Sequence, residues 1–245
     1  MSAKSPYPTL PSHLGGFQAS GYRENEPVAQ FEIGDYRNFI YLVLDAETKQ
    51  AAVIDPQEDL EPIESALAQG AYTLKAIWLT HTHFDHIAGV EPLLESRPDL
   101  PVYVHSADTF RLKESSALFQ KAVHAFEDGA RLKVGSLTAV AHHTPGHSAG
   151  GTSYFLEAKG KESGLRRYLF SGDTLFIRDC GRTDLETGSN KQMFESLQKY
   201  KKLQADTIVL PGHHYAKECA SPLEKEMRES PPLLCKSVDE LARLP

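Results

Sequence analysis

The feature that most constrains this chain is a histidine-rich segment, residues 81–86 (HTHFDH), which directly follows an apolar run at residues 74–80 (LKAIWLT). The apolar run predicts a buried strand, and residues 90–96 predict a short helix beyond the motif. Neutral imidazoles and a carboxylate are donors for a borderline divalent cation, which would offset the cost of clustering them. The segment therefore predicts a metal site in a loop at the carboxyl end of a strand, in preference to a solvated polar loop.

Three later segments repeat this design of apolar strand, sharp turn and metal-type donor. Residues 144–147 (TPGH) and 210–213 (LPGH) place a histidine after a Pro-Gly turn, and residues 171–173 (SGD) end a strand on an aspartate. Each is weak alone, because a surface histidine or an ordinary Asx turn gives the same pattern. Seven donors are too many for one tetrahedral ion but suit two ions that share a bridge. The candidate ligands are His81, His83, Asp85, His86, His147, Asp173 and His213.

The rest of the chain predicts an α/β protein. Residues 1–26 contain prolines and glycines with little periodicity, and we interpret them as an N-terminal extension. Because one α/β domain can reach about 250 residues, we expect residues 27–245 to form one domain with a short helical C-terminal tail. His142 and His143 are interpreted as strand-end residues rather than ligands. Helical spacing or composition occurs at residues 59–69, 107–125, 191–202 and 216–229.

Composition narrows the choice of partners. The net charge is −7 and no dense basic cluster occurs, which argues against nucleic acid as a partner. Three cysteines without a CxxC spacing favour a reducing compartment over a disulfide scaffold. Neither a signal peptide nor a run of about 18 apolar residues is found. We expect a cytoplasmic protein with no membrane partner; the sequence does not define its oligomeric state.

With these motifs in this order, the chain resembles the metallo-β-lactamase superfamily from about Phe31 to His213. The resemblance implies an α/β (αββα) fold, a four-layer αβ/βα sandwich with metals at the edge between its two sheets. It implies that one ion is held by three histidines, that a second is held by one aspartate and two histidines, and that Asp173 bridges them. The first group would be His81, His83 and His147, and the second Asp85, His86 and His213.

Several stretches are similar to glyoxalase II, the hydroxyacylglutathione hydrolases, notably residues 38–45 (NFIYLVLD) and 172–176 (GDTLF). The resemblance implies that Arg182 and Tyr215 contact glutathione. Two departures matter. Too few residues follow His213 for that family's C-terminal helical domain, and residues 177–184 (IRDCGRTD) are similar to the persulfide dioxygenase branch. Leu185, Glu186 and His214 depart from that branch in turn.

Two enzymatic hypotheses follow, both with a small glutathione-derived substrate. The first is a dinuclear hydrolase of glutathione thioesters, in which a hydroxide shared by two divalent ions attacks the carbonyl and Asp85 helps to orient it. Zinc is preferred, and iron or manganese is compatible with the same donors. The alternative is a dioxygenase of glutathione persulfide with a single Fe(II) on His81, His147 and Asp173. A non-catalytic module, a β-lactamase and a nuclease are less favoured, and the acyl group is not defined.

Overall fold

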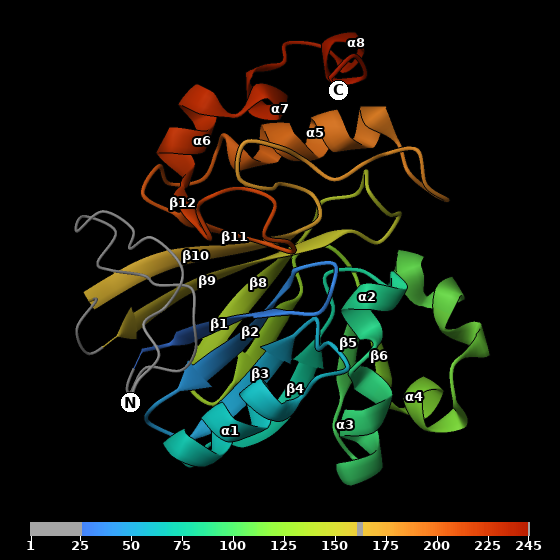
Figure 1. Cartoon of the computed structure of the whole chain (residues 1–245), viewed down its shortest axis with the longest axis vertical. Helices are drawn as coiled ribbons and strands as arrows, with labels where there is room; N and C mark the ends of the chain where they lie inside the picture. Colours follow the sequence, from blue (N-terminus) through green and yellow to red (C-terminus); the bar gives the residue numbers. More distant parts are fainter. Residues whose placement is uncertain (1–25, 161–163, 245) are drawn as a thin grey trace.

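Two mixed β-sheets lie face to face in the computed structural model, which describes residues 26–160 and 164–244 (Figure 1). The first sheet is built from the first half of the chain and has the spatial order β1-β2-β3-β4-β5-β6. Its first three strands pair antiparallel, and β3 to β6 pair parallel. The strands are β1 (Val28–Ile33), β2 (Asn38–Asp45), β3 (Gln50–Ile54), β4 (Thr73–Trp78), β5 (Val102–His105) and β6 (Val123–Phe126).

The second sheet follows along the chain and has the order β12-β11-β10-β9-β8-β7. Its pairs are antiparallel except β10 with β11, which run parallel. The strands are β7 (Arg131–Val134), β8 (Leu137–His143), β9 (Thr152–Gly160), β10 (Gly164–Gly172), β11 (Ile208–Pro211) and β12 (Ser221–Pro222). Each sheet is therefore made from one continuous half of the described chain.

Helices cover the outer face of each sheet (Figure 1). On the first sheet they are α1 (Glu61–Gly70), α2 (Phe84–Ile87), α3 (Val90–Ser96), the 3₁₀ helix η2 (Ser106–Glu114) and α4 (Ala117–Ala122). On the second they are α5 (Asn190–Tyr200), α6 (Leu223–Glu229), α7 (Pro231–Leu234) and α8 (Val238–Leu241). Among residues 26–160 and 164–244, none of the helices has the length and apolar character needed to cross a bilayer.

Strand β2 shows why the layers assemble in this order. All eight of its residues are buried, which a strand requires when both faces of its sheet are covered. Side chains alternate along a strand, so Phe39 and Tyr41 pack into the core between the sheets while Ile40 and Leu42 pack against the helices. A third core lies between the second sheet and α5 to α8. These three cores separate four layers, and the predicted αβ/βα sandwich is confirmed.

Two helix predictions were wrong in part. Residues 107–125 were expected to form one helix, but η2 ends near Ser115, Ser116 caps the short α4, and Val123–Phe126 pairs with β5. Residues 216–229 were also expected to be helical. There the helix begins only at Leu223, because Pro222 disfavours helical geometry at Ser221, which pairs in β12 instead. Of the predicted extension at residues 1–26, all but Glu26 lies outside the described residues.

Candidate metal centre

All seven predicted donors lie at one edge of the sandwich, between the two sheets. The first sheet supplies four of them, because His81 follows β4 and the next three lie at or in α2. The second sheet supplies His147 from the loop between β8 and β9, Asp173 after β10 and His213 after β11. Six of the seven are buried, and His83 is partly exposed. Strand ends from both halves of the chain therefore converge as the repeated strand-turn-donor pattern predicts.

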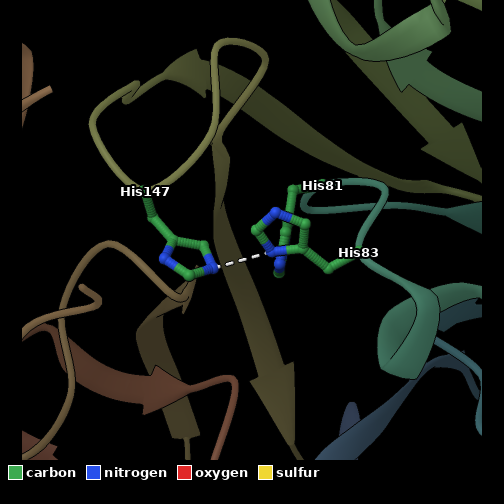
Figure 2. A group of neighbouring side chains, drawn as sticks. All are labelled: His81, His83 and His147. Carbon is green, nitrogen blue, oxygen red and sulfur yellow. Dashed lines mark hydrogen bonds between the residues drawn. The ribbon is translucent and has the colours of Figure 1, made fainter. Parts of the chain in front are cut away.

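Six of the seven donors form two groups, and within each group the ligand atoms lie within 4.8 Å of one another. A third set at the same spacing joins Asp55 to His81 and His86. The first group is His81, His83 and His147, whose rings point toward a common centre in Figure 2. In this group, His83 Nδ1 lies 2.9 Å from His147 Nε2. The second group, Asp85, His86 and His213, places His86 Nε2 at 3.2 Å from His213 Nε2. Each group has the donor chemistry of a three-residue metal site.

Asp173 lies between the two groups. Its Oδ2 is 3.5 Å from His147 Nε2 and 3.3 Å from His213 Nε2, so one carboxylate oxygen reaches a member of each group. Gly212 permits this position, because a Cβ there would lie 2.2 Å from Asp173 Oδ1. A side chain at residue 212 would displace the carboxylate, and the PGH turn thus serves Asp173 as well as His213.

Two of the histidines are oriented by one buried aspartate that the ligand prediction missed. Asp55 Oδ2 accepts from His86 Nδ1 at 3.0 Å and from the Thr80 hydroxyl at 2.5 Å. Since that hydroxyl donates its proton to Asp55, its lone pair accepts from His81 Nδ1 at 3.0 Å. Both imidazoles consequently turn Nε2 toward the centre, as is usual when outer partners hold the ligating histidines of a metal site. Asp55 directly follows β3, and this position after a strand was the signal available in the sequence.

Backbone carbonyls orient two more histidines. His147 Nδ1 donates to the carbonyl of Arg182 at 2.8 Å, and His213 Nδ1 donates to that of Tyr36 at 2.8 Å. Four of the five imidazoles therefore present Nε2 to the centre, while His83 presents Nδ1. No sequence pattern could reveal these acceptors, because a carbonyl is common to every residue type.

Asn38 holds the second group from the start of β2. Its side-chain amide donates to Asp85 Oδ2 at 3.0 Å, and Gln57 donates to its carbonyl oxygen at 3.3 Å. Asn38 is fully buried, so the position of Asp85 is fixed by an amide with no exposure to solvent. His214, next to His213, contacts Glu32 and Phe39 instead of the centre.

The electrostatics of the centre fit divalent ions. Burial, together with the neighbouring His86, lowers the pKa of His81 well below its usual value, and burial beside His147 lowers the pKa of His83 to about 4. Although burial opposes it, the charges of His86 and His213 hold the pKa of Asp173 well below its usual value. His81 Nε2 and Asp173 Oδ1 are buried without a hydrogen-bond partner among the described residues. Although burial opposes it, the charge of Asp173 and the hydrogen bond to Asp55 raise the pKa of His86 to about 9, so a cation would take the place of a proton there. Low imidazole pKa values at His81 and His83, an ionised carboxylate and unsatisfied ligand atoms match what a bound cation requires.

A cavity of 970 Å³ opens over the centre. Of the six large apolar side chains that are exposed in the described residues, four line this cavity. Concave, mostly apolar pockets with a few polar groups are typical of small-molecule sites, so the cavity indicates where substrate binds. The four apolar residues are Tyr36, Phe84, Leu185 and Tyr215, and the cationic lining residues are Arg111 and Arg182.

Cys180 also lines the cavity, but its chemistry is that of a packed thiol. Burial, with the nearby charge of Asp179, raises the pKa of Cys180 to about 12. At pH 8 we therefore expect roughly one thiolate in ten thousand at Cys180, and alkylation by iodoacetamide much slower than for free cysteine. Peptide mass spectrometry with Cys180→Ser as the blank measures this rate, and labelling of Cys180 at the free-cysteine rate would contradict it.

The fold and the seven clustered donors define a protein of a metal-dependent class. The pattern of the Metallo-beta-lactamase superfamily matches residues 33–213, and the chain belongs to this superfamily. Among curated relatives, it is 38% identical to the hydroxyacylglutathione hydrolase of Synechococcus sp. over 178 residues, which cover 73% of this chain and 65% of the relative. The chain thus spans less than two thirds of that relative's length.

Solved structures share this fold. ETHE1 from Myxococcus xanthus has a TM-score of 0.74 and 29% identity, covering 89% of this chain and 92% of that chain. TTHA1623 in a di-iron-bound form has a TM-score of 0.65 and 32% identity, covering 82% of this chain and 97% of that chain. These two similarities extend over nearly the full length of the compared structures.

Proposed function

We propose that this protein is a dinuclear metal-dependent hydrolase of glutathione thioesters. The observation that carries the proposal is Asp173, whose carboxylate lies between two complete three-donor groups in the position of a shared ligand. One ion would be held by His81, His83 and His147, and the other by Asp85, His86 and His213. The similarity to a structure with two irons and the identity to hydroxyacylglutathione hydrolases support this proposal.

Two bound ions would supply a hydroxide at neutral pH and polarise the thioester carbonyl. Zinc is our first choice of metal because the donors are mainly imidazole, with iron or manganese as alternatives. The protein's own contribution is geometry. Asn38 fixes Asp85, which we assign to orienting the nucleophile, and Asp55 fixes His86. Phe84 and Tyr36 give the cavity an apolar wall beside the centre.

We assign substrate binding to Arg182 and Tyr215, which line the cavity beside the centre. Tyr215 stacks on His213 with ring centroids 4.8 Å apart, so its exposed ring lies over the second donor group. The Arg182 guanidinium forms a two-pronged pair with Asp184, with nitrogen to oxygen distances of 2.6 and 2.8 Å. A substrate carboxylate would have to compete with Asp184 for this guanidinium.

Replacing Arg182 by alanine is expected to raise KM for S-lactoylglutathione roughly tenfold with a smaller effect on kcat, because the lost contact is made equally in the ground and transition states. Asp184→Asn is the matched variant, and it is expected to lower KM because it removes the competing carboxylate. Steady-state kinetics measure both. A fall in kcat with an unchanged KM for Arg182→Ala would contradict the assigned role.

Metal content and thioester hydrolysis, measured on the same preparation, test the proposed function. We expect two ions per chain and hydrolysis of S-lactoylglutathione, measured as loss of its thioester absorbance. Chelation should abolish this activity, and added metal should restore it. A fully metallated protein that hydrolyses no glutathione thioester would refute the substrate assignment.

A second candidate is a persulfide dioxygenase with one Fe(II). The similarity to ETHE1, which extends over 92% of that chain, favours it, as does the segment at residues 177–184. His81, His147 and Asp173 would then form the iron triad. Oxygen uptake by iron-loaded protein with glutathione persulfide would support this candidate, and no uptake with one bound iron would exclude it.

A further inference from the structure

Another buried aspartate outside the donor set, Asp108, lies on the 3₁₀ helix η2 that follows β5. Asp108 has no solvent exposure, and its carboxylate accepts three hydrogen bonds. The donors are the backbone N–H of Gly150 at 2.6 Å, the hydroxyl of Ser148 at 3.0 Å and the backbone N–H of Thr82 at 3.2 Å. A buried carboxylate is costly unless its oxygens are satisfied in this way.

These three donors belong to the two loops that carry the first ligand group. Thr82 lies between His81 and His83 in the loop after β4, whereas Ser148 follows His147 in the loop between β8 and β9. The two loops come from different sheets, and Asp108 bonds to both. The contact is also sterically specific, since a Cβ on Gly150 would lie 2.6 Å from the carboxyl carbon of Asp108.

We propose that Asp108 is a positioning residue for the ion of the three-histidine group, an inference that rests on the metal assignment above and not on the substrate. By joining the two loops, it fixes the separation of the histidines they carry, which is 2.9 Å between His83 Nδ1 and His147 Nε2. A metal site binds tightly only if its ligands are held in place before the ion arrives.

The effect is expected to be selective for one ion. The second group has its own anchors, because Asp55 holds His86, Asn38 holds Asp85, and the carbonyl of Tyr36 holds His213. None of these three contacts involves Asp108. Loss of the Asp108 carboxylate should therefore weaken binding of the ion held by the three histidines and leave binding of the other ion unchanged.

The chain contains a matched control for a merely structural role. Asp45 is also buried, and it too accepts from two backbone N–H groups and a hydroxyl, those of Ser136, Glu47 and Thr48. It ties two turns together at the far end of β2, about 23 Å along the strand from Asn38. Asp45→Asn removes the same kind of bonds as Asp108→Asn but at a distance from the metal centre.

The test is titration of Co²⁺ into the metal-free full chain carrying His213→Ala, which leaves only the three-histidine group with its full set of ligands. We expect Asp108→Asn to weaken Co²⁺ binding in this background by about tenfold or more, with a change in the Co²⁺ visible spectrum. Asp45→Asn should leave both affinity and spectrum unchanged while lowering Tm.

Two outcomes for the Asp108 variant decide against the role. Equal losses of affinity for Asp108→Asn and Asp45→Asn, or no loss for Asp108→Asn, would show that Asp108 is only structural. If circular dichroism shows that Asp108→Asn does not fold, Ser148→Ala is used instead, because it removes only one of the three hydrogen bonds. A smaller loss of Co²⁺ affinity is then expected, and no loss would overturn the inference. If the His213→Ala chain itself binds no Co²⁺, the ligand assignment is contradicted. If the wild-type chain binds Co²⁺ but hydrolyses no thioester, only the proposed substrate fails and the role of Asp108 stands.

Discussion

Asp173→Asn is expected to lower kcat/KM for thioester hydrolysis by about a thousandfold or more, equivalent to roughly 4 kcal/mol of lost transition-state stabilisation. The amide keeps the size of the side chain but loses its negative charge. It also places an N–H₂ group where His86, His147 and His213 present nitrogen atoms within 3.5 Å. The variant should therefore lose the shared ligand without disturbing the surrounding fold.

Metal analysis and kinetics on the same preparation check this prediction. Asp173→Asn is expected to retain fewer than two ions per chain, and excess zinc should not restore its activity. Asp206→Asn is the control, because Asp206 is an exposed partner of Arg167 away from the centre. A variant at residue 173 that retains two ions and at least a tenth of the activity would exclude a bridging role for Asp173.

Removal of the metal is expected to lower Tm by roughly 10 °C, with recovery on addition of zinc. An ion present at a thousandfold its Kd stabilises the folded state by about 4 kcal/mol, and 1 kcal/mol shifts Tm by about 2–4 °C for a chain of this size. Without ions, the edge of the sandwich retains buried ligand atoms, including His81 Nε2, that have no hydrogen-bond partner within residues 26–160 and 164–244.

Differential scanning calorimetry with and without a chelator measures this shift. His81→Ala combined with His86→Ala removes a ligand from each group, so the chelator should have little further effect on its Tm. A wild-type Tm that does not respond to chelation would show that the donors hold no ion under those conditions.

The donor set was the part of the site most accessible from the sequence. His81 follows β4 of the first sheet, whereas His147 and His213 follow β8 and β11 of the second, and these strand ends meet at one edge of the sandwich. The local pattern therefore specified both the residue types and their position at strand ends. It also predicted most of the strands, because alternation and apolar runs are set by burial on one or both faces.

The supporting residues were harder to predict, because their roles depend on tertiary contacts. Asp108 lies in a polar stretch whose sequence predicts one long helix, and its partners are 26 to 42 positions away along the chain. The carbonyls that orient His147 and His213 carry no sequence signal at all. The β6 strand was missed for a similar reason, since Val123–Phe126 is extended only because β5 offers it a partner.

The division of the donors between the two sheets has a consequence for assembly. The strands of the first sheet lie within residues 28–126 and those of the second within residues 131–222. Cleavage of the chain in the turn near Gly129 would therefore give two fragments that each carry an incomplete ligand set. Neither piece alone holds all members of the first group, because His81 and His83 come from one and His147 from the other. Metal affinity therefore reports directly whether the two halves have docked in register. The turn near Gly129 is accordingly a suitable position at which to divide the chain for a split reporter.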